Sequence, residues 1–331
     1  LMNKNLSYAE SINEAFNFIL KNFSESFVIG QGLWSPWYVG STMRGLPEKF
    51  GKNRIIDSPV SEAAVTGIAT GASLNDMKPI VVHPRMDFML LAADAIINQS
   101  AKWKFMLGGA NSPNVTIRSI INRGGEQGAQ HSQSLYSMFA NIPGVIVVLP
   151  SNPQDAFNLL VKSIITKSTV IYIDDRWLYS EIDKIKIDNK ILKKNLLNEE
   201  PEIIQQGEDL TIISLGYGVK IIKEVSTMLN KKKIKSEVID LRIINPLRPK
   251  KLINSAIKTK RVVVLDYGWS NCGIASEVVS QIAEKTDKDK VKIRYLKITL
   301  PSMPAPTNKI NESEYYISSK EVLKKILKHF F

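Results

Sequence analysis

The chain is poor in the residues that build cross-linked or metal-bound folds. It has 331 residues but a single cysteine, Cys272, which excludes an internal disulfide and a thiolate metal cluster within the chain. The aspartates Asp57, Asp87 and Asp94 have no partners at the spacing of a metal site. We therefore expect no metal ion that is bound by this chain alone.

Long apolar runs are also absent. No stretch reaches the roughly 18 consecutive apolar residues that are needed to cross a bilayer. Residues 1–10 are polar and lack the basic-then-apolar pattern of a signal peptide. With 44% hydrophobic and 23% charged residues, the composition is that of a globular chain with room for two domains. We expect a cytoplasmic protein without a membrane partner.

Acidic residues are few: the chain has 32 Asp and Glu against 44 Lys and Arg, which gives a net charge of +12. Such a balance raises nucleic-acid binding as a non-enzymatic alternative. The sequence has no zinc-finger spacing and no basic region with heptads, and much of its lysine follows Tyr179. We expect a solvated surface or a face for an acidic protein partner, and no nucleic-acid partner. Tight retention of nucleic acid on a filter at physiological salt would favour the alternative.

Short apolar runs alternate with helical patterns along the first part of the chain. The predicted strands are residues 27–30, 54–56, 79–82, 114–118, 145–150 and 170–173. The predicted helices are residues 8–22, 62–74, 88–105, 135–141 and 153–166. Alternating strands and helices imply parallel pairing and crossover connections. Residues 1–180 are therefore predicted to form a three-layer α/β domain.

The composition changes after this domain. Residues 181–207 are rich in lysine and asparagine, and we interpret them as a linker. The alternation then restarts, with predicted strands at 210–215, 236–241, 261–266 and 292–297 and predicted helices at 219–229, 249–258 and 274–285. Residues 208–331 are predicted to form a second, smaller three-layer α/β domain. Ligands of such sheets bind at the carboxyl ends of the strands.

Glu62 is a candidate catalytic residue at one strand end. It follows a turn after a predicted strand and opens a helix, where the helix dipole favours an acid, so a purely structural role stays open. Ala63, Gly67 and Gly71 lie four residues apart behind it. This stripe without side-chain bulk favours close packing of another helix, including one from another subunit.

His131 is the second candidate. It follows the glycine-rich loop of residues 123–128 and is framed by small polar residues, as an accessible proton carrier would be. A structural histidine is the alternative at this position. The residues alone thus predict a two-domain α/β enzyme with a carboxylate and an imidazole at separate strand ends.

Several segments, in the same order along the chain, resemble the beta subunits of 2-oxo acid dehydrogenases. The matching segments are residues 54–62 (RIIDSPVSE), 98–109 (NQSAKWKFMLGG), 128–134 (GAQHSQS), 142–151 (IPGVIVVLPS), 240–247 (DLRIINPL) and 266–269 (DYGW). These subunits belong to the thiamine-diphosphate-dependent, decarboxylating component, within the transketolase-like superfamily. The resemblance implies a transketolase-like pyrimidine-binding domain followed by a transketolase C-terminal-like domain.

The resemblance also assigns roles. Glu62 is expected to bond a ring nitrogen of the aminopyrimidine of thiamine diphosphate, with Phe88 stacked on the pyrimidine and Val60 in contact with it. His131 is expected to face the substrate-derived intermediate and to stabilise or protonate it. The implied activity is decarboxylation of a 2-oxo acid, as in pyruvate dehydrogenase, and transfer of the acyl unit to a lipoyl group or another acceptor.

One family motif is missing. The sequence has no Gly-Asp-Gly segment followed by Asn, the pattern that holds the diphosphate through Mg²⁺. The resemblance therefore implies a separate alpha subunit that supplies this half of the site in an α2β2 heterotetramer. A lipoyl acyltransferase core and a small 2-oxo acid complete the expected partners.

Two departures from the family pattern concern the acyl acceptor. Gln31 stands where the family has an acid, and residues 82–88 (VHPRMDF) introduce His83 and Arg85 into a mostly apolar motif. We hypothesise a polar carbonyl acceptor such as a keto-sugar, hence a carboligase; the alternative is that His83 and Arg85 pair to stabilise the loop. A split transketolase-like subunit is a further alternative, which residues 130–132 (QHS) and the second domain count against.

Overall fold

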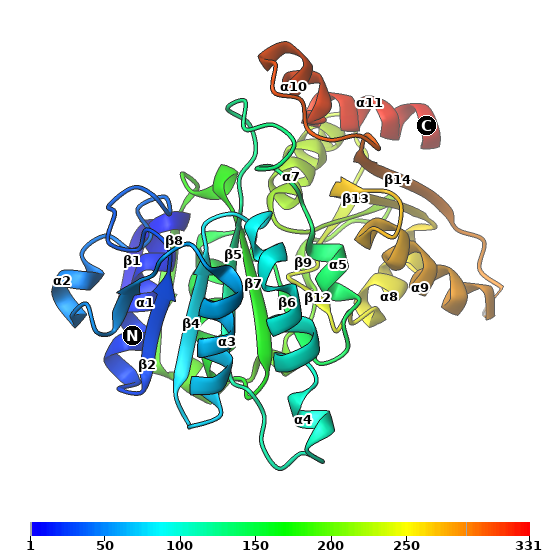
Figure 1. Cartoon of the computed structure of the whole chain (residues 1–331). Coiled ribbons are helices and arrows are strands. Elements are labelled where there is room, and N and C mark those ends of the chain that lie inside the picture. Colours follow the sequence, from blue (N-terminus) through cyan, green and yellow to red (C-terminus); the bar gives the residue numbers. More distant parts are fainter. Residues whose placement is uncertain (1, 289) are drawn as a thin grey trace. The chain divides into compact units, whose positions relative to one another are not determined.

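The computed structural model describes residues 2–288 and 290–331, and its fold divides into two compact units (Figure 1). Unit 1 comprises Leu1–Arg123 and Met138–Glu199, and unit 2 comprises Gly124–Ser137 and Glu200–Phe331. The chain thus enters unit 2 twice, first with a short segment that includes His131. Each unit is an α/β structure, which confirms the predicted fold class.

Unit 1 is built on a parallel sheet whose strands lie in the order β6-β7-β5-β4-β2-β3. These strands are β2 (Ser26–Gly30), β3 (Ile55–Asp57), β4 (Lys78–His83), β5 (Thr116–Ile121), β6 (Val145–Val148) and β7 (Thr169–Asp175). Every residue of β5 and β7 is buried, as expected for central parallel strands with helices on both faces. The carboxyl ends of β2, β3 and β4 therefore meet at one edge of the sheet.

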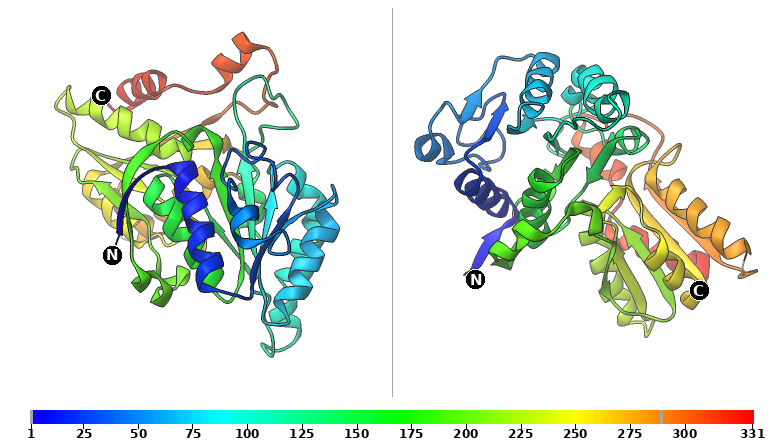
Figure 2. Two further views of the ribbon diagram at one scale, coloured as in Figure 1. Left: turned by 90° about the vertical axis from the view of Figure 1, so that its left-hand side faces the viewer. Right: turned by 90° about the horizontal axis from the view of Figure 1, so that it is seen from below.

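Helices cover both faces of this sheet (Figure 2). On one face α1 (Tyr8–Asn22) packs against α6 (Pro153–Ile165). On the other face α3 (Glu62–Ser73) packs on β4 and on the helical segments η1 (Phe88–Ala92) and η2 (Ala95–Ser100). The shorter helices are α2 (Leu46–Phe50), α4 (Trp103–Met106), α5 (Tyr136–Ala140) and η3 (Arg176–Leu178).

The predicted helix at 88–105 is not one regular α-helix. It is a 3₁₀ segment, a π segment and a short α segment in succession. The wide turn forms because the Ala101 N–H donates to the Ile96 carbonyl five residues back, at 2.9 Å. The Ser100 and Thr169 hydroxyls lie 2.6 Å apart and join this turn to β7.

A two-stranded sheet lies outside the sequence prediction. β1 (Met2–Ser7) pairs antiparallel with β8 (Ile182–Ile187), which falls in the segment that we interpreted as a linker. The same segment continues with η4 (Asn189–Lys193), η5 (Leu196–Asn198) and β9 (Glu202–Gln205). Residues 181–207 are therefore ordered, and their first part, as far as Glu199, belongs to unit 1.

Unit 2 has a sheet in the order β14-β13-β10-β11-β9, parallel except for β9. Its elements are β10 (Leu210–Ser214), α7 (Tyr217–Asn230), β11 (Ser236–Asp240), β12 (Ile243–Asn245), α8 (Lys250–Thr259), β13 (Arg261–Trp269), α9 (Ile274–Lys288), β14 (Arg294–Leu300), α10 (Lys309–Tyr315) and α11 (Ser319–Phe330). α11 packs on α7, and α8 packs on α9. The sequence did not predict the two terminal helices, although the reciprocal hydrogen bonds of Ser318 and Glu321 cap the start of α11.

Among the described residues, no helix combines the length and the apolar character that a membrane span requires.

Candidate active site

Glu62 is the first residue of α3, directly after the turn that follows β3. Its side chain is on the inner face of the helix and the residue is only 8% exposed, together with buried Val65 and Thr66. Within residues 2–288 and 290–331, no group donates a hydrogen bond to the Glu62 carboxylate and no cation pairs with it. A buried carboxylate is normally satisfied by such partners, so Glu62 is a candidate for binding a ligand.

Glu62 lines a small hollow, about 10 Å³ in cavity volume, at the carboxyl ends of three neighbouring strands. The lining residues are Gly30, Gln31, Ser58, Pro59, Val60, Ser61, Glu62, Val65, Val82, His83 and Pro84. Four of the predicted site residues therefore meet here: Gln31, Val60, Glu62 and His83. A side chain at Gly30 would put its Cβ 2.3 Å from the Val82 carbonyl oxygen, so glycine is needed where β2 approaches β4.

His83 ends β4 and forms part of the wall of this hollow. It is 2% exposed, and its Nε2 lies 3.2 Å from the Thr66 hydroxyl, one helical turn after Glu62. Burial lowers the pKa of the His83 imidazole to about 4, so the ring is neutral at pH 7. The partner of His83 is therefore Thr66 and not Arg85, and the pair that we considered between His83 and Arg85 does not form in the described structure.

Arg85 and Phe88 follow the hollow along the chain but are not among the described residues that line it. Arg85 is half-buried, and its Nη1 donates to the Pro84 carbonyl at 3.0 Å. Burial and the nearby Arg176 guanidinium lower the pKa of Arg85. Phe88 opens η1 with a half-buried ring, and η1 packs against α3, the helix of Glu62.

His131 belongs to unit 2, whereas Glu62 belongs to unit 1. The histidine is half-buried, and its backbone N–H donates to the Gly128 carbonyl at 3.4 Å. The Ser132 hydroxyl donates to the same carbonyl at 2.9 Å, which closes a compact turn. The imidazole is therefore carried by a structured loop and is partly exposed.

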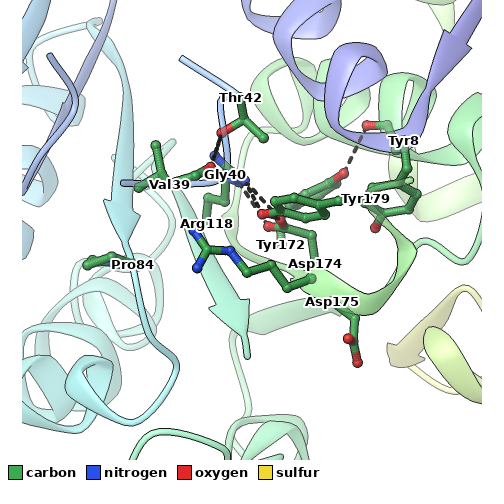
Figure 3. A network of polar contacts seen from close by, with 12 residues as sticks. Tyr8, Val39, Gly40, Thr42, Pro84, Arg118, Tyr172, Asp174, Asp175 and Tyr179 are labelled. Carbon is green, nitrogen blue, oxygen red and sulfur yellow. Dashed lines mark hydrogen bonds and ion pairs between the residues drawn. The ribbon is translucent and has the colours of Figure 1, made fainter. Parts of the chain in front are cut away.

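A buried polar network near the hollow was missed by sequence reasoning (Figure 3). Arg118 of β5 donates from Nε and Nη2 to the two carboxylate oxygens of Asp174 of β7, at 2.9 and 2.8 Å. Its Nη1 donates to the Thr42 hydroxyl at 2.8 Å and its Nη2 to the Tyr179 hydroxyl at 3.0 Å. Burial raises the pKa of Tyr179 well above its usual range, so the phenol stays protonated and donates to Asp174.

This network fixes the loop that follows Gln31. Thr42 of this loop accepts a hydrogen bond directly from Arg118. Gly40 packs so tightly on the Tyr179 ring that a Cβ added to Gly40 would lie 2.2 Å from the ring. The Tyr38 carbonyl accepts from Arg176 Nη2 at 2.7 Å. An arginine within the apolar strand of residues 116–121 was the only sequence signal for this arrangement, because its partner lies 56 residues away.

Comparisons with known proteins give the family. Residues 4–179 match the model described as transketolase, pyrimidine binding domain, and residues 199–322 match transketolase, C-terminal domain. The acetoin:2,6-dichlorophenolindophenol oxidoreductase subunit beta of Bacillus subtilis (strain 168) is 30% identical, over 94% of this chain and 93% of that protein. The mitochondrial pyruvate dehydrogenase E1 component subunit beta of Saccharomyces cerevisiae is 28% identical, over 98% of this chain and 88% of that protein.

A solved structure titled "Split gene transketolase, inactive beta4 tetramer" has the same fold, with a TM-score of 0.76, 17% identity and 99% of each chain covered. At that identity the likeness concerns the fold alone. The sequence relatives extend over nearly the whole chain and carry both domains in the same order. The chain therefore belongs to the beta-subunit family of the 2-oxo acid dehydrogenases, in which a transketolase pyrimidine-binding domain precedes a transketolase C-terminal domain.

Proposed function

We propose that this chain is the beta subunit of a heteromeric, thiamine-diphosphate-dependent enzyme that decarboxylates a 2-oxo acid and transfers the acyl unit. The observation that carries the proposal is the buried Glu62 carboxylate, which faces a hollow and has no partner among the described residues. The lining suits a group with a hydrogen-bond donor beside an apolar surface, since Val60 and Val65 lie there with Glu62. The aminopyrimidine of thiamine diphosphate has this chemistry.

Glu62 would hold the cofactor by sharing a proton with a ring nitrogen of the aminopyrimidine. When bound, thiamine diphosphate supplies a carbon nucleophile for 2-oxo acid chemistry. Val60, 66% exposed on the rim of the hollow, and the Phe88 ring offer apolar contacts to the pyrimidine face.

His131 would hold or deliver a proton at the oxygen of the reacting 2-oxo group. Its half-buried position on a structured loop suits this role, since a proton carrier must be fixed and yet reachable. In this proposal Glu62 transfers a proton on the cofactor, and His131 transfers a proton on the substrate.

An alpha subunit would supply the Mg²⁺ and diphosphate half of the site in an α2β2 assembly. The described residues contain no cluster of three or more His, Cys, Asp or Glu that could hold a metal ion, and the sequence lacks the Gly-Asp-Gly motif. The outer face of α3 supports an interface: Ala63, Gly67 and Gly71 are exposed there, beside Ile68, which is 60% exposed. A bare helix face of this kind allows close approach of another chain.

Glu62→Gln tests the cofactor role. The variant keeps the size and one acceptor oxygen but loses the proton-sharing carboxylate. In the enzyme reconstituted with its alpha subunit, turnover of pyruvate with 2,6-dichlorophenolindophenol as electron acceptor should fall by about 10²–10⁴-fold. The matched control is Glu48→Gln, an exposed acid in the first turn of α2, which should keep full turnover. Full turnover of Glu62→Gln would overturn the proposal.

The acyl acceptor has two candidates, a lipoyl group and a polar carbonyl compound. Gln31 and the neutral His83 support the second, because they line the hollow with groups that form hydrogen bonds without a charge. Arg85 adds a cation directly after the hollow. Partition of the acyl unit between free lipoamide and a keto-sugar should shift toward lipoamide in a variant with His83→Phe and Arg85→Met. If the partition between lipoamide and the keto-sugar is unchanged, His83 and Arg85 have a structural role only.

A further inference from the structure

The backbone of the loop before His131 is unusual. Gly124, Gly125 and Glu126 have φ angles of 70°, 66° and 60°, so three consecutive residues lie in the left-handed region. Glycine adopts this conformation freely, but Glu126 has a Cβ and does not. The loop therefore needs contacts from its surroundings that keep Glu126 in this conformation.

Glu312 of α10 provides such a contact. The residue is 6% exposed, and its two carboxylate oxygens accept the Glu126 backbone N–H at 3.2 and 3.1 Å. A hydrogen bond to an ionised carboxylate is stronger than one between neutral groups. This bond joins residues 186 positions apart in the sequence, both within unit 2.

The helix that carries Glu312 is itself fixed. Tyr315, three residues further on the same helix face, donates its hydroxyl hydrogen bond to the Met303 carbonyl at 3.0 Å. The indole Nε1 of Trp269, at the end of β13, donates to the Tyr315 hydroxyl at 3.2 Å. The central sheet of unit 2 thus holds α10, and α10 holds Glu126.

The rest of the loop is held by the same unit. Gly128 (φ 72°) packs against Thr307, and a Cβ there would lie 2.6 Å from the Thr307 hydroxyl oxygen. Beyond His131, the Tyr136 hydroxyl donates to Asp266, which also accepts the Gly268 N–H at 2.8 Å. His131 therefore lies between an anchor at Glu126 and an anchor at Tyr136.

We propose that Glu312 is a positioning residue, which fixes the loop of residues 124–131 and thereby the place of His131. The inference rests on the proposed function only where it concerns turnover. The tether itself stands on contacts within unit 2. Loss of the carboxylate removes the charge-assisted bond that offsets the left-handed conformation of Glu126, so the loop opens more often.

Hydrogen exchange on the full-length chain tests the tether. In Glu312→Ala, the amides of residues 124–131 should exchange about tenfold faster, a factor that corresponds to about 1.4 kcal/mol. Glu312→Gln keeps one acceptor oxygen and should lie between wild type and the alanine variant. Glu314→Gln, an exposed acid on the same helix, should leave the loop unchanged. Peptides from β13 should exchange as in wild type in every variant, which shows that unit 2 is folded. Unchanged loop exchange in Glu312→Ala would overturn the inference.

Turnover in the complex with the alpha subunit tests the consequence for His131. Glu312→Gln should lower kcat at least severalfold with an unchanged KM for the 2-oxo acid, and should shift the pH profile of kcat, because the proton carrier is misplaced while substrate binding is kept. A loosened loop with wild-type kcat and pH profile would overturn the positioning role. Full activity of His131→Ala would instead overturn the role that the proposed function gives to His131, and the exchange experiment would still decide the tether.

Discussion

Replacement of Asp174 by asparagine is expected to destabilise unit 1 by about 3–5 kcal/mol. The side chains of Arg118 and Asp174 are both 0% exposed, and the guanidinium donates two hydrogen bonds to the carboxylate, at 2.9 and 2.8 Å. Burial opposes the charged form of Arg118, but Asp174 together with Tyr179 and Tyr172 outweighs it and raises the pKa of the guanidinium. Without that carboxylate, a buried cation keeps only neutral partners, namely the amide oxygen of the asparagine and the Thr42 and Tyr179 hydroxyls.

The control is an ion pair of the same length on the surface. Lys4 and Glu14 lie 2.9 Å apart with side chains 33% and 26% exposed. Because water screens this pair, Glu14→Gln should change the free energy of unfolding by no more than about 1 kcal/mol. The two pairs have nearly the same length; they differ in burial and in the second hydrogen bond that Arg118 donates to its carboxylate.

Urea unfolding followed by tryptophan fluorescence measures both variants, because four of the five tryptophans are in unit 1: Trp34, Trp37, Trp103 and Trp177. The double variant of Asp174→Asn and Arg118→Met should recover part of the loss, since it leaves no unpaired charge. A loss for Asp174→Asn that equals the loss for Glu14→Gln would refute the reasoning. A double variant that is less stable than the sum of the single losses would refute it as well.

Three further predictions concern other parts of the molecule. The pKa of His83 is about 4 in the folded chain against an ordinary 6.5. Between these pH values the unfolded chain therefore binds more protons than the folded chain. The contribution of neutral His83 to the free energy of unfolding is complete above pH 6.5 and declines as the pH falls toward 4. About 2 kcal/mol should be lost by pH 5, and His83→Gln should flatten this slope in urea titrations while His329→Gln keeps it. Gly71→Ala should raise the free energy of unfolding by about 1 kcal/mol, because the new Cβ on α3 meets open space. Gly144→Ala should lower it by roughly 2 kcal/mol or more, because the new Cβ would lie 2.0 Å from the Ala101 carbonyl oxygen. The chain alone should not decarboxylate pyruvate, and turnover without an alpha subunit would contradict the proposed half-site.

The sequence predicts elements well where burial follows a regular period. Tyr8–Asn22 was predicted with its correct bounds, because its apolar residues recur at helical spacing. β1 and β8 were missed, because polar residues interrupt both short strands and the paired residues are about 180 positions apart in the sequence. Each of these two strands forms because it pairs with the other, and not because its own sequence has a regular apolar period.

The candidate site was predictable as far as strand ends and the family motif determine it. Gln31, Val60, Glu62 and His83 meet in one hollow because β2, β3 and β4 are parallel neighbours. The neutral state of His83 could not be predicted, since it depends on how deeply the end of β4 is covered. The Arg118–Asp174 pair depends on the adjacency of β5 and β7, which local sequence does not encode.

The double entry of the chain into unit 2 has a consequence for synthesis on the ribosome. The second segment of unit 1 ends at Glu199, so all of unit 1 has been made while most of unit 2, to which residues 124–137 belong, has yet to be translated. Glu312 emerges about 180 residues after His131, which at ~5–20 residues per second is a wait of roughly 10–40 s. During that interval the glycine-rich loop lacks the hydrogen bond from the Glu126 N–H to Glu312. A residue of α10 thus completes a loop that was translated about 180 residues earlier.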